Sequence, residues 1–162
     1  MSEAWINQIV EDIKVKDHNA AEQAAKEKHR LAVIAEKGPI FWRSFADFLK
    51  KFVEEIRAGL EGDVTQGNIN CEFDPTSGRI QINKSAFPFL TFNAAPNYSG
   101  QPMIPNYVKV NPQQGGSPHS GQSIPCRFEV VGHDDLILQL NGSSYAAPDF
   151  AAKFLIEKLF TI

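Results

Sequence analysis

The sequence contains few of the residues that usually identify a biochemical activity. Among its 162 residues are only two cysteines, two methionines and four histidines. Cys71 and Cys126 lie far apart in the chain and in strand-like runs, so a disulfide between them is possible but not implied. We therefore expect two buried thiols in a reducing, cytoplasmic compartment. The sequence also contains no glycine-rich phosphate loop and no nucleophile elbow.

Clusters of positive charge and long apolar runs are missing as well. The formal charge is −3, and the 16 lysines and arginines are spread along the chain. Nucleic-acid binding requires a basic face, which such a distribution does not provide. No stretch approaches the roughly 20 apolar residues of a membrane span, and the first residues lack the positive start and apolar run of a signal peptide. We expect a cytoplasmic protein that binds neither nucleic acid nor membrane.

Charge is almost absent from residues 85–123, where Lys109 is the only formally charged residue. The segment is rich in aromatic residues, proline, glycine and small polar residues. Such a surface suits neutral ligands that form hydrogen bonds, such as glycans or extended peptides. The alternative is that these residues form loops that only connect strands. The candidate ligand-binding residues are two tyrosines, whose rings have a polar tip, and three amides: Tyr98, Tyr107, Asn97, Gln101 and Asn106.

Residues 39–60 show the most regular apolar pattern in the chain. The spacing of three and four residues predicts an amphipathic helix that packs on a sheet. Pro39 suits the first turn of this helix, and Trp42 beside the apolar stripe is a candidate subunit contact. A ligand cavity lined by phenylalanine is the alternative to simple packing. The apolar positions of the stripe are Phe41, Phe45, Phe48, Leu49, Phe52, Val53, Ile56 and Leu60.

Residues 2–37 are also predicted to be helical, with apolar residues in an eleven-residue repeat typical of a coiled coil. One continuous helix of this length would extend about 54 Å, which is longer than a compact domain of this size. We expect it either to fold back near residues 16–19 or to pack against another subunit. The Gly38-Pro39 pair should break or bend the chain. The candidate interface residues are Trp5, Ile9, Ile13, Leu31 and Trp42.

Alternating apolar and polar residues after position 68 predict strands. Residues 69–73 and 80–83 flank a turn sequence, which predicts a hairpin. Further strands are expected at residues 87–92 and 103–110, and a second hairpin at residues 124–131 and 136–140. The fold class is therefore α+β, with an antiparallel sheet of about five or six strands and a helix after Pro148 that packs on the sheet. Residues 1–37 form a helical extension, and residues 38–162 form one domain.

One polar cluster outside the helices could carry chemistry. His133, Asp134 and Asp135, with Glu129, offer metal-ligand side chains, but a hairpin loop explains them equally well. Metal ligands usually converge from more than one element, so we assign no metal and no cofactor. His119 has no partner visible in the sequence, and we assign no catalytic residue.

Three functions fit these observations. The first is a non-enzymatic interaction module that forms homo-oligomers through its N-terminal helix and binds a partner through the uncharged segment. The second is a carrier or sensor of a small neutral or apolar ligand held between sheet and helix. The third is an enzyme of unknown type, which the absence of a catalytic motif makes the weakest of the three.

Overall fold

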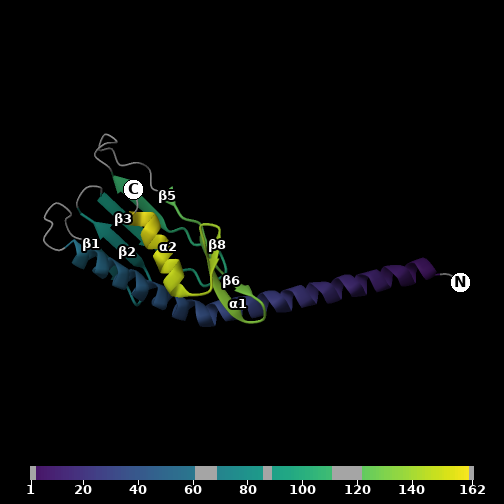
Figure 1. Ribbon diagram of the computed structural model, residues 1–162. Helices are drawn as coiled ribbons and strands as arrows, with labels where there is room; N and C mark the ends of the chain where they lie inside the picture. Colours follow the sequence, from purple (N-terminus) through teal and green to yellow (C-terminus); the bar gives the residue numbers. More distant parts are fainter. Residues whose placement is uncertain (1–2, 61–68, 86–88, 111–121, 161–162) are drawn as a thin grey trace.

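The dominant element of the fold is one very long helix. A computed structural model describes residues 3–60, 69–85, 89–110 and 122–160. In it, helix α1 (Ala4–Gly59) continues through Pro39, so two predicted helices are one. Figure 1 shows its first half projecting from the rest of the molecule and its second half lying along the sheet and helix α2 (Pro148–Phe160).

Of the two outcomes predicted for Gly38-Pro39, a break or a bend, the break does not occur, because α1 continues through both residues. The axis of α1 instead changes direction where the helix enters the folded part (Figure 1), which is the bend that a proline inside a helix causes. Proline removes one backbone hydrogen bond and crowds the preceding turn. The helix persists because packing holds both sides of the proline: Val33 and Ile34 before it, and Phe41 and Trp42 after it, are buried.

The strands form two antiparallel sheets. The larger sheet has the order β1-β2-β3-β4-β5, and the smaller has the order β6-β7-β8. An isolated bridge between Met103 and Cys126 connects the two. The strands are β1 (Ile69–Phe73), β2 (Ile80–Lys84), β3 (Phe89–Ala94), β4 (Asn106–Val110), β5 (Gln122–Ser123), β6 (Cys126–Val131), β7 (Asp135–Leu140) and β8 (Ser143–Tyr145).

Both predicted hairpins are confirmed, and so is the α+β class. In the first hairpin, the Asp74 carboxylate accepts hydrogen bonds from Thr76 N and Ser77 Oγ, both at 2.9 Å. These bonds hold the pKa of Asp74 below its usual value, and the bond from Thr76 N has the larger effect. Strands β5 and β8 were not predicted because they are only two and three residues long. Part of the expected strand at residues 87–92 lies outside the described residues.

The helices and the sheets share one hydrophobic core. One face of β2 contributes the buried Ile80 and Ile82, whereas Gln81 on the other face donates to Asn93 Oδ1 at 2.9 Å. The core therefore lies on the helix side of the larger sheet. At the end of α1, Arg57 donates two hydrogen bonds to Ile69 O, at 2.6 and 2.9 Å, and so ties the helix to β1.

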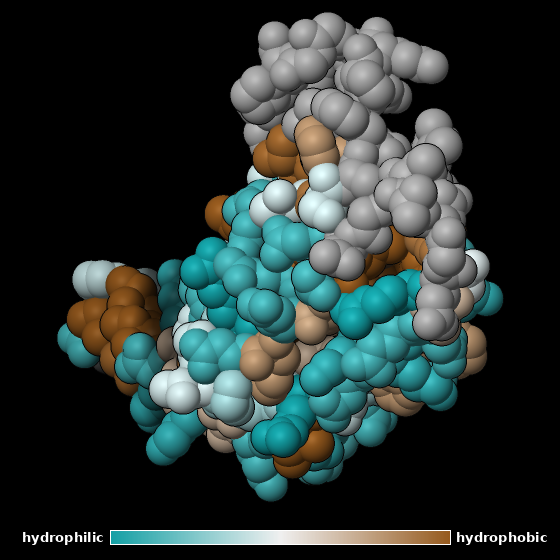
Figure 2. Space-filling view, turned by 90° about the vertical axis from the view of Figure 1, so that its left-hand side faces the viewer, coloured by the Kyte–Doolittle hydropathy of each residue, from teal (hydrophilic) through white to brown (hydrophobic). Residues whose placement is uncertain are grey.

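No helix in the described part of the chain is both long and apolar enough to cross a membrane. On the face that lies away from the projecting half of α1, hydrophilic surface predominates and hydrophobic side chains gather in smaller patches (Figure 2). The largest run of exposed apolar residues is instead on the projecting helix itself.

Candidate functional site

The projecting part of α1 is here called the arm and comprises residues 4–29. Every residue of the arm is exposed. Trp5 is 67% exposed and Ile13 is 51% exposed, although both are residues that folding normally buries. The exposed large apolar residues of the arm are Trp5, Ile6, Ile9, Val10, Ile13 and Val15.

Residues 4–28 of the arm have only local polar contacts among the described residues. Gln8 donates to Asp12, and His18 Nε2 lies 3.2 Å from Glu22 Oε1, each one turn along the same helix. Pairs of this kind contribute only a few tenths of a kcal/mol. Up to residue 28, the arm is therefore held by its own backbone and not by contacts with the folded part.

The base of the arm, in contrast, is tied to the smaller sheet. Arg30 Nε donates to Glu129 Oε1 at 2.6 Å, and Lys37 Nζ donates to Asp134 O at 2.7 Å. The hydrogen bond from Arg30 holds the pKa of Glu129 below its usual value. These contacts fix the direction in which the arm leaves the molecule.

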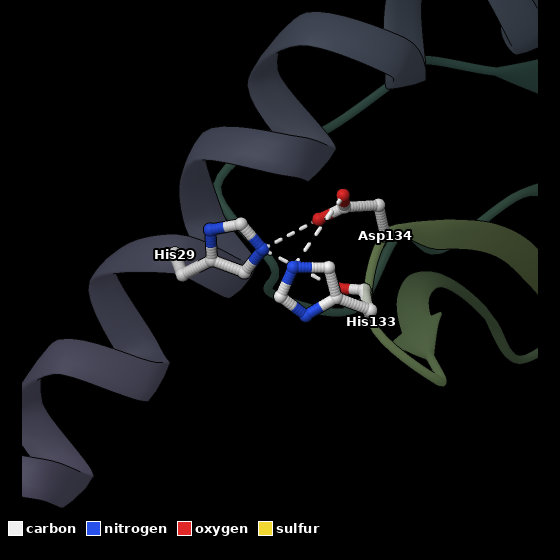
Figure 3. A group of neighbouring side chains, drawn as sticks. All are labelled: His29, His133 and Asp134. Atoms are coloured by element: carbon white, nitrogen blue, oxygen red, sulfur yellow. Dashed lines mark hydrogen bonds and ion pairs between the residues drawn. The ribbon is translucent and has the colours of Figure 1, made fainter.

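His29 joins the two residues of the β6–β7 turn that the sequence singled out. His29 Nε2 lies 2.6 Å from Asp134 Oδ1 and 3.2 Å from His133 O. The rings of His29 and His133 are stacked, with centroids 5.3 Å apart. Figure 3 shows the two rings and the carboxylate pointing toward one another from the helix and the turn. The hydrogen bond from His29 lowers the pKa of Asp134.

The two predicted ligand-binding tyrosines lie inside the fold to different degrees. Tyr107 is 7% exposed and donates to Gln122 Oε1 at 2.5 Å. Tyr98 is partly buried and stacks on Phe128, with centroids 5.9 Å apart. Burial raises the pKa of Tyr98. Both rings thus serve the packing of the protein, which leaves little of either surface for a ligand.

The three predicted amides are closer to the surface. Asn97 is partly buried, and its Oδ1 accepts from Ser99 N, whereas Gln101 and Asn106 are exposed. A nearby open pocket of about 490 Å³ is lined by Met103, Ile104 and Arg127, among others, but by none of the five predicted residues. The structure does not bring the five together around one pocket, and ligand binding there stays a prediction.

The interface candidates fall into two groups. Trp5, Ile9 and Ile13 lie exposed on the arm, whereas Leu31 is partly covered at its base. Trp42 is 1% exposed, and its Nε1 donates to Gly78 O at 2.6 Å. Trp42 is therefore a core residue. Its ring lies on the buried face of α1 and does not reach the surface.

Burial outweighs any activating influence on the two thiols, including the charge of Lys50 near Cys71. Cys71 and Cys126 are both buried and free. Burial raises the pKa of Cys71 to about 11 and that of Cys126 to about 12. Cys126 and Arg127 are neighbours on strand β6, and successive side chains of a strand point to opposite faces. Accordingly, Cys126 is buried and Arg127 is exposed.

Sequence reasoning missed the role of His29 and Arg30. Both appear in the sequence as ordinary polar residues of a charged helix, and their partners are about 100 positions away. The sequence indicated this cluster only through the closeness of Glu129, His133 and Asp134 in one short segment. His119 and most of the predicted loop at residues 111–123 lie outside the described residues.

Comparisons of the chain with protein families, with characterised proteins and with solved structures found no match. The functional argument therefore depends on the residues and their geometry alone.

Proposed function

We propose that the protein is a non-enzymatic interaction module that self-associates through its arm. The observation that carries the proposal is the continuous exposure of residues 4–29, with Trp5, Ile9 and Ile13 on one side of the helix. Large apolar patches on a protein surface mark sites of association. The base contacts of Arg30 and Lys37 support this role, because they hold the arm out in a defined direction.

The energetics of an isolated helix support the same conclusion. Helices draw most of their stability from packing an amphipathic face, and a helix in water without such packing is marginal. β-Branched residues such as Ile9, Val10 and Ile13 lower its intrinsic stability further. Covering each large apolar side chain contributes about 1.5–3 kcal/mol. A second helix along the arm would therefore stabilise both the arm and the assembly.

A second copy of the chain, paired antiparallel, fits the distribution of side-chain sizes. The arm carries its bulky apolar residues near the N-terminus and small ones, Ala20 and Ala24, farther along the same stripe. An antiparallel pair places large residues opposite small ones, which lets facing layers interdigitate at one helix spacing. In a parallel pair, the two helix axes would have to lie far apart at Ile9 and Ile13 and close together at the alanines.

Charge along the arm favours the same orientation. Within the arm, residues 4–17 hold three acidic and two basic residues, net −1, whereas residues 18–29 hold two acidic and two basic residues, net 0. Parallel pairing therefore places the two acidic halves side by side, whereas antiparallel pairing places each acidic half beside a neutral one. The same acidic balance disfavours a membrane as the occupant, because helices that lie on membranes are usually rich in lysine and arginine.

The proposal of a non-enzymatic role is supported by the described residues, among which no reaction centre is visible. Both thiols are buried with raised pKa values, and the predicted tyrosines pack in the fold. Two unpaired thiols also agree with a cytoplasmic location, where thiols stay reduced.

Sedimentation of the full chain at several concentrations tests self-association. We expect a dimer that Ile13→Glu converts to monomer, because the new charge would be buried at the pairing face. Val15→Glu is the matched control, since Val15 is similarly exposed but lies on the opposite side of the helix. A chain that stays monomeric at every concentration would overturn the proposal, and so would equal loss of the dimer in both variants.

The orientation of the pair has its own test. A nitroxide label at Asn7→Cys reports the distance between the two arms, because the native thiols are buried. Antiparallel pairing over residues 4–29 places the labels about 30 Å apart, whereas parallel pairing places them about 10 Å apart. The short distance would contradict the antiparallel arrangement.

A further inference from the structure

Three ligand-type side chains from two separate elements meet at the base of the arm. His29 comes from α1, whereas His133 and Asp134 come from the turn between β6 and β7. One potential ligand atom from each lies within 4.8 Å of the others. His29 Nε2 and Asp134 Oδ1 are 2.6 Å apart, and His133 Nε2 and Asp134 Oδ2 are 3.8 Å apart. The convergence from two elements, which the sequence alone did not indicate, is the requirement that a metal site has to meet.

Side-chain shifts of less than 1 Å would bring the printed separations to those of a tetrahedral centre. With zinc–nitrogen and zinc–oxygen distances near 2.0–2.1 Å, ligand atoms around the ion lie about 3.3–3.4 Å from one another. The separation of His29 Nε2 from Asp134 Oδ1, 2.6 Å, therefore has to widen, and that of His133 Nε2 from Asp134 Oδ2, 3.8 Å, has to narrow. His133 is 90% exposed at its side chain, so its ring has room to rotate toward a shared ion. Two imidazoles and one carboxylate are a ligand set that zinc accepts, whereas calcium and magnesium prefer oxygen ligands throughout.

We propose that His29, His133 and Asp134 bind one Zn²⁺ ion, which fastens the base of the arm to the β6–β7 turn. A fourth coordination position is left for water. Glu129 is not part of the site, because its carboxylate is occupied by Arg30. This site is independent of the pairing of the arms.

Besides these shifts, binding requires a change of tautomer at His29. In the structure, His29 Nε2 faces two acceptors, His133 O and Asp134 Oδ1, so it carries the proton. As a ligand to zinc, Nε2 offers its lone pair, and the proton moves to Nδ1 by a change of tautomer. The ion then takes the place of this proton between the imidazole and the carboxylate.

The rings of the two histidines lie stacked beside one another. The ring centroids are 5.3 Å apart with an interplanar angle of 25°. His133 Nε2 also lies 3.8 Å from Asp134 Oδ2, so both imidazoles face the same carboxylate. An ion bound through ring nitrogens lies in the plane of each ring, so His133, which is free to turn, has to rotate out of the stack to reach it.

Titration of zinc chloride into the untagged full chain, after treatment with EDTA, tests the site. We expect one ion per chain, a rise in the melting temperature with zinc, and no such rise with magnesium. His133→Ala is the most informative variant, because this exposed side chain contributes little to folding. Loss of a ligand should weaken zinc binding roughly tenfold or more in His133→Ala and in Asp134→Asn.

His18→Ala is the matched control. His18 lies on the same helix and also contacts a carboxylate, Glu22, but has no second histidine nearby in the described part of the chain. We expect its zinc affinity to equal that of the wild type. Absence of stoichiometric binding would overturn the proposal. Binding that His133→Ala and Asp134→Asn leave unchanged would place the ion elsewhere and would overturn it equally.

Discussion

The ring of Tyr98 packs directly against Gly38 inside helix α1. A Cβ atom added at Gly38 would lie 2.8 Å from Tyr98 Cδ1, which is closer than two carbon atoms can approach. Tyr98 also stacks on Phe128, so its ring cannot move aside freely. Gly38, which together with Pro39 suggested a break or bend in the chain, thus leaves room for the Tyr98 ring to pack against α1.

This contact predicts that Gly38→Ala destabilises the protein. Alanine favours a helix by about 1 kcal/mol over glycine, but overlap with a fixed ring costs about 1–3 kcal/mol. We expect a net loss of up to about 2 kcal/mol in the free energy of unfolding, measured by urea denaturation. In a Tyr98→Ala background, the same change should no longer destabilise. Additive effects of the two substitutions would contradict the contact.

Trp42 gives a second prediction, because its indole both fills the core and donates to Gly78 O at 2.6 Å. Trp42→Phe removes the donor and leaves a buried carbonyl without its partner, which should cost about 1–3 kcal/mol. Trp5→Phe is the control on the exposed arm. In that variant the fluorescence comes from Trp42 alone and should resist quenching by acrylamide. Efficient quenching would show that Trp42 is accessible after all.

Local patterns were enough to predict much of the fold. The hairpin of β1 and β2 was found because alternation and the turn at Asp74 act within a few residues. The start of α2 at Pro148 was found for the same reason. The exposed face of the arm was also visible, because Ile9 and Ile13 repeat without a partner stripe in the domain.

What the sequence could not provide depends on contacts between distant residues. Trp42 lies beside the apolar stripe in a helical projection, and only the packing of Gly78 and Phe128 around it shows that it is core. The strands divide into two sheets, which are joined at Met103 and Cys126. The alternation of apolar and polar residues within a strand does not show to which sheet the strand belongs. His29 and Asp134 meet across 105 positions, which no spacing rule anticipates.

Acid should weaken the contact between Glu129 and Arg30. The pKa of Glu129 is lowered in the folded protein by the hydrogen bond from Arg30, so folding favours the ionised carboxylate. The stabilisation is complete above the ordinary glutamate pKa of about 4.3 and is lost as the pH falls through the lower pKa of the folded state. We expect Glu129→Gln to lose about 1–3 kcal/mol at pH 7.

The difference between wild type and Glu129→Gln is the quantity to measure, because other carboxylates such as Asp74 also have lowered pKa values. Urea denaturation at a series of pH values gives this difference directly. It should shrink below about pH 4. A difference that stays constant down to pH 3 would show that the stability of the pair does not depend on ionised Glu129.

The thiols provide the last prediction, which concerns reactivity. Burial raises the pKa of Cys71 to about 11 and that of Cys126 to about 12, so at pH 8 only about one thousandth or less of either thiol is ionised. A disulfide reagent such as DTNB attacks through the thiolate, and we therefore expect almost no reaction with the native protein over minutes. In denaturant, both thiols should react at once and give two equivalents per chain. Rapid reaction of one native thiol would mean that its strand opens readily, and Cys71→Ser and Cys126→Ser would identify which strand opens.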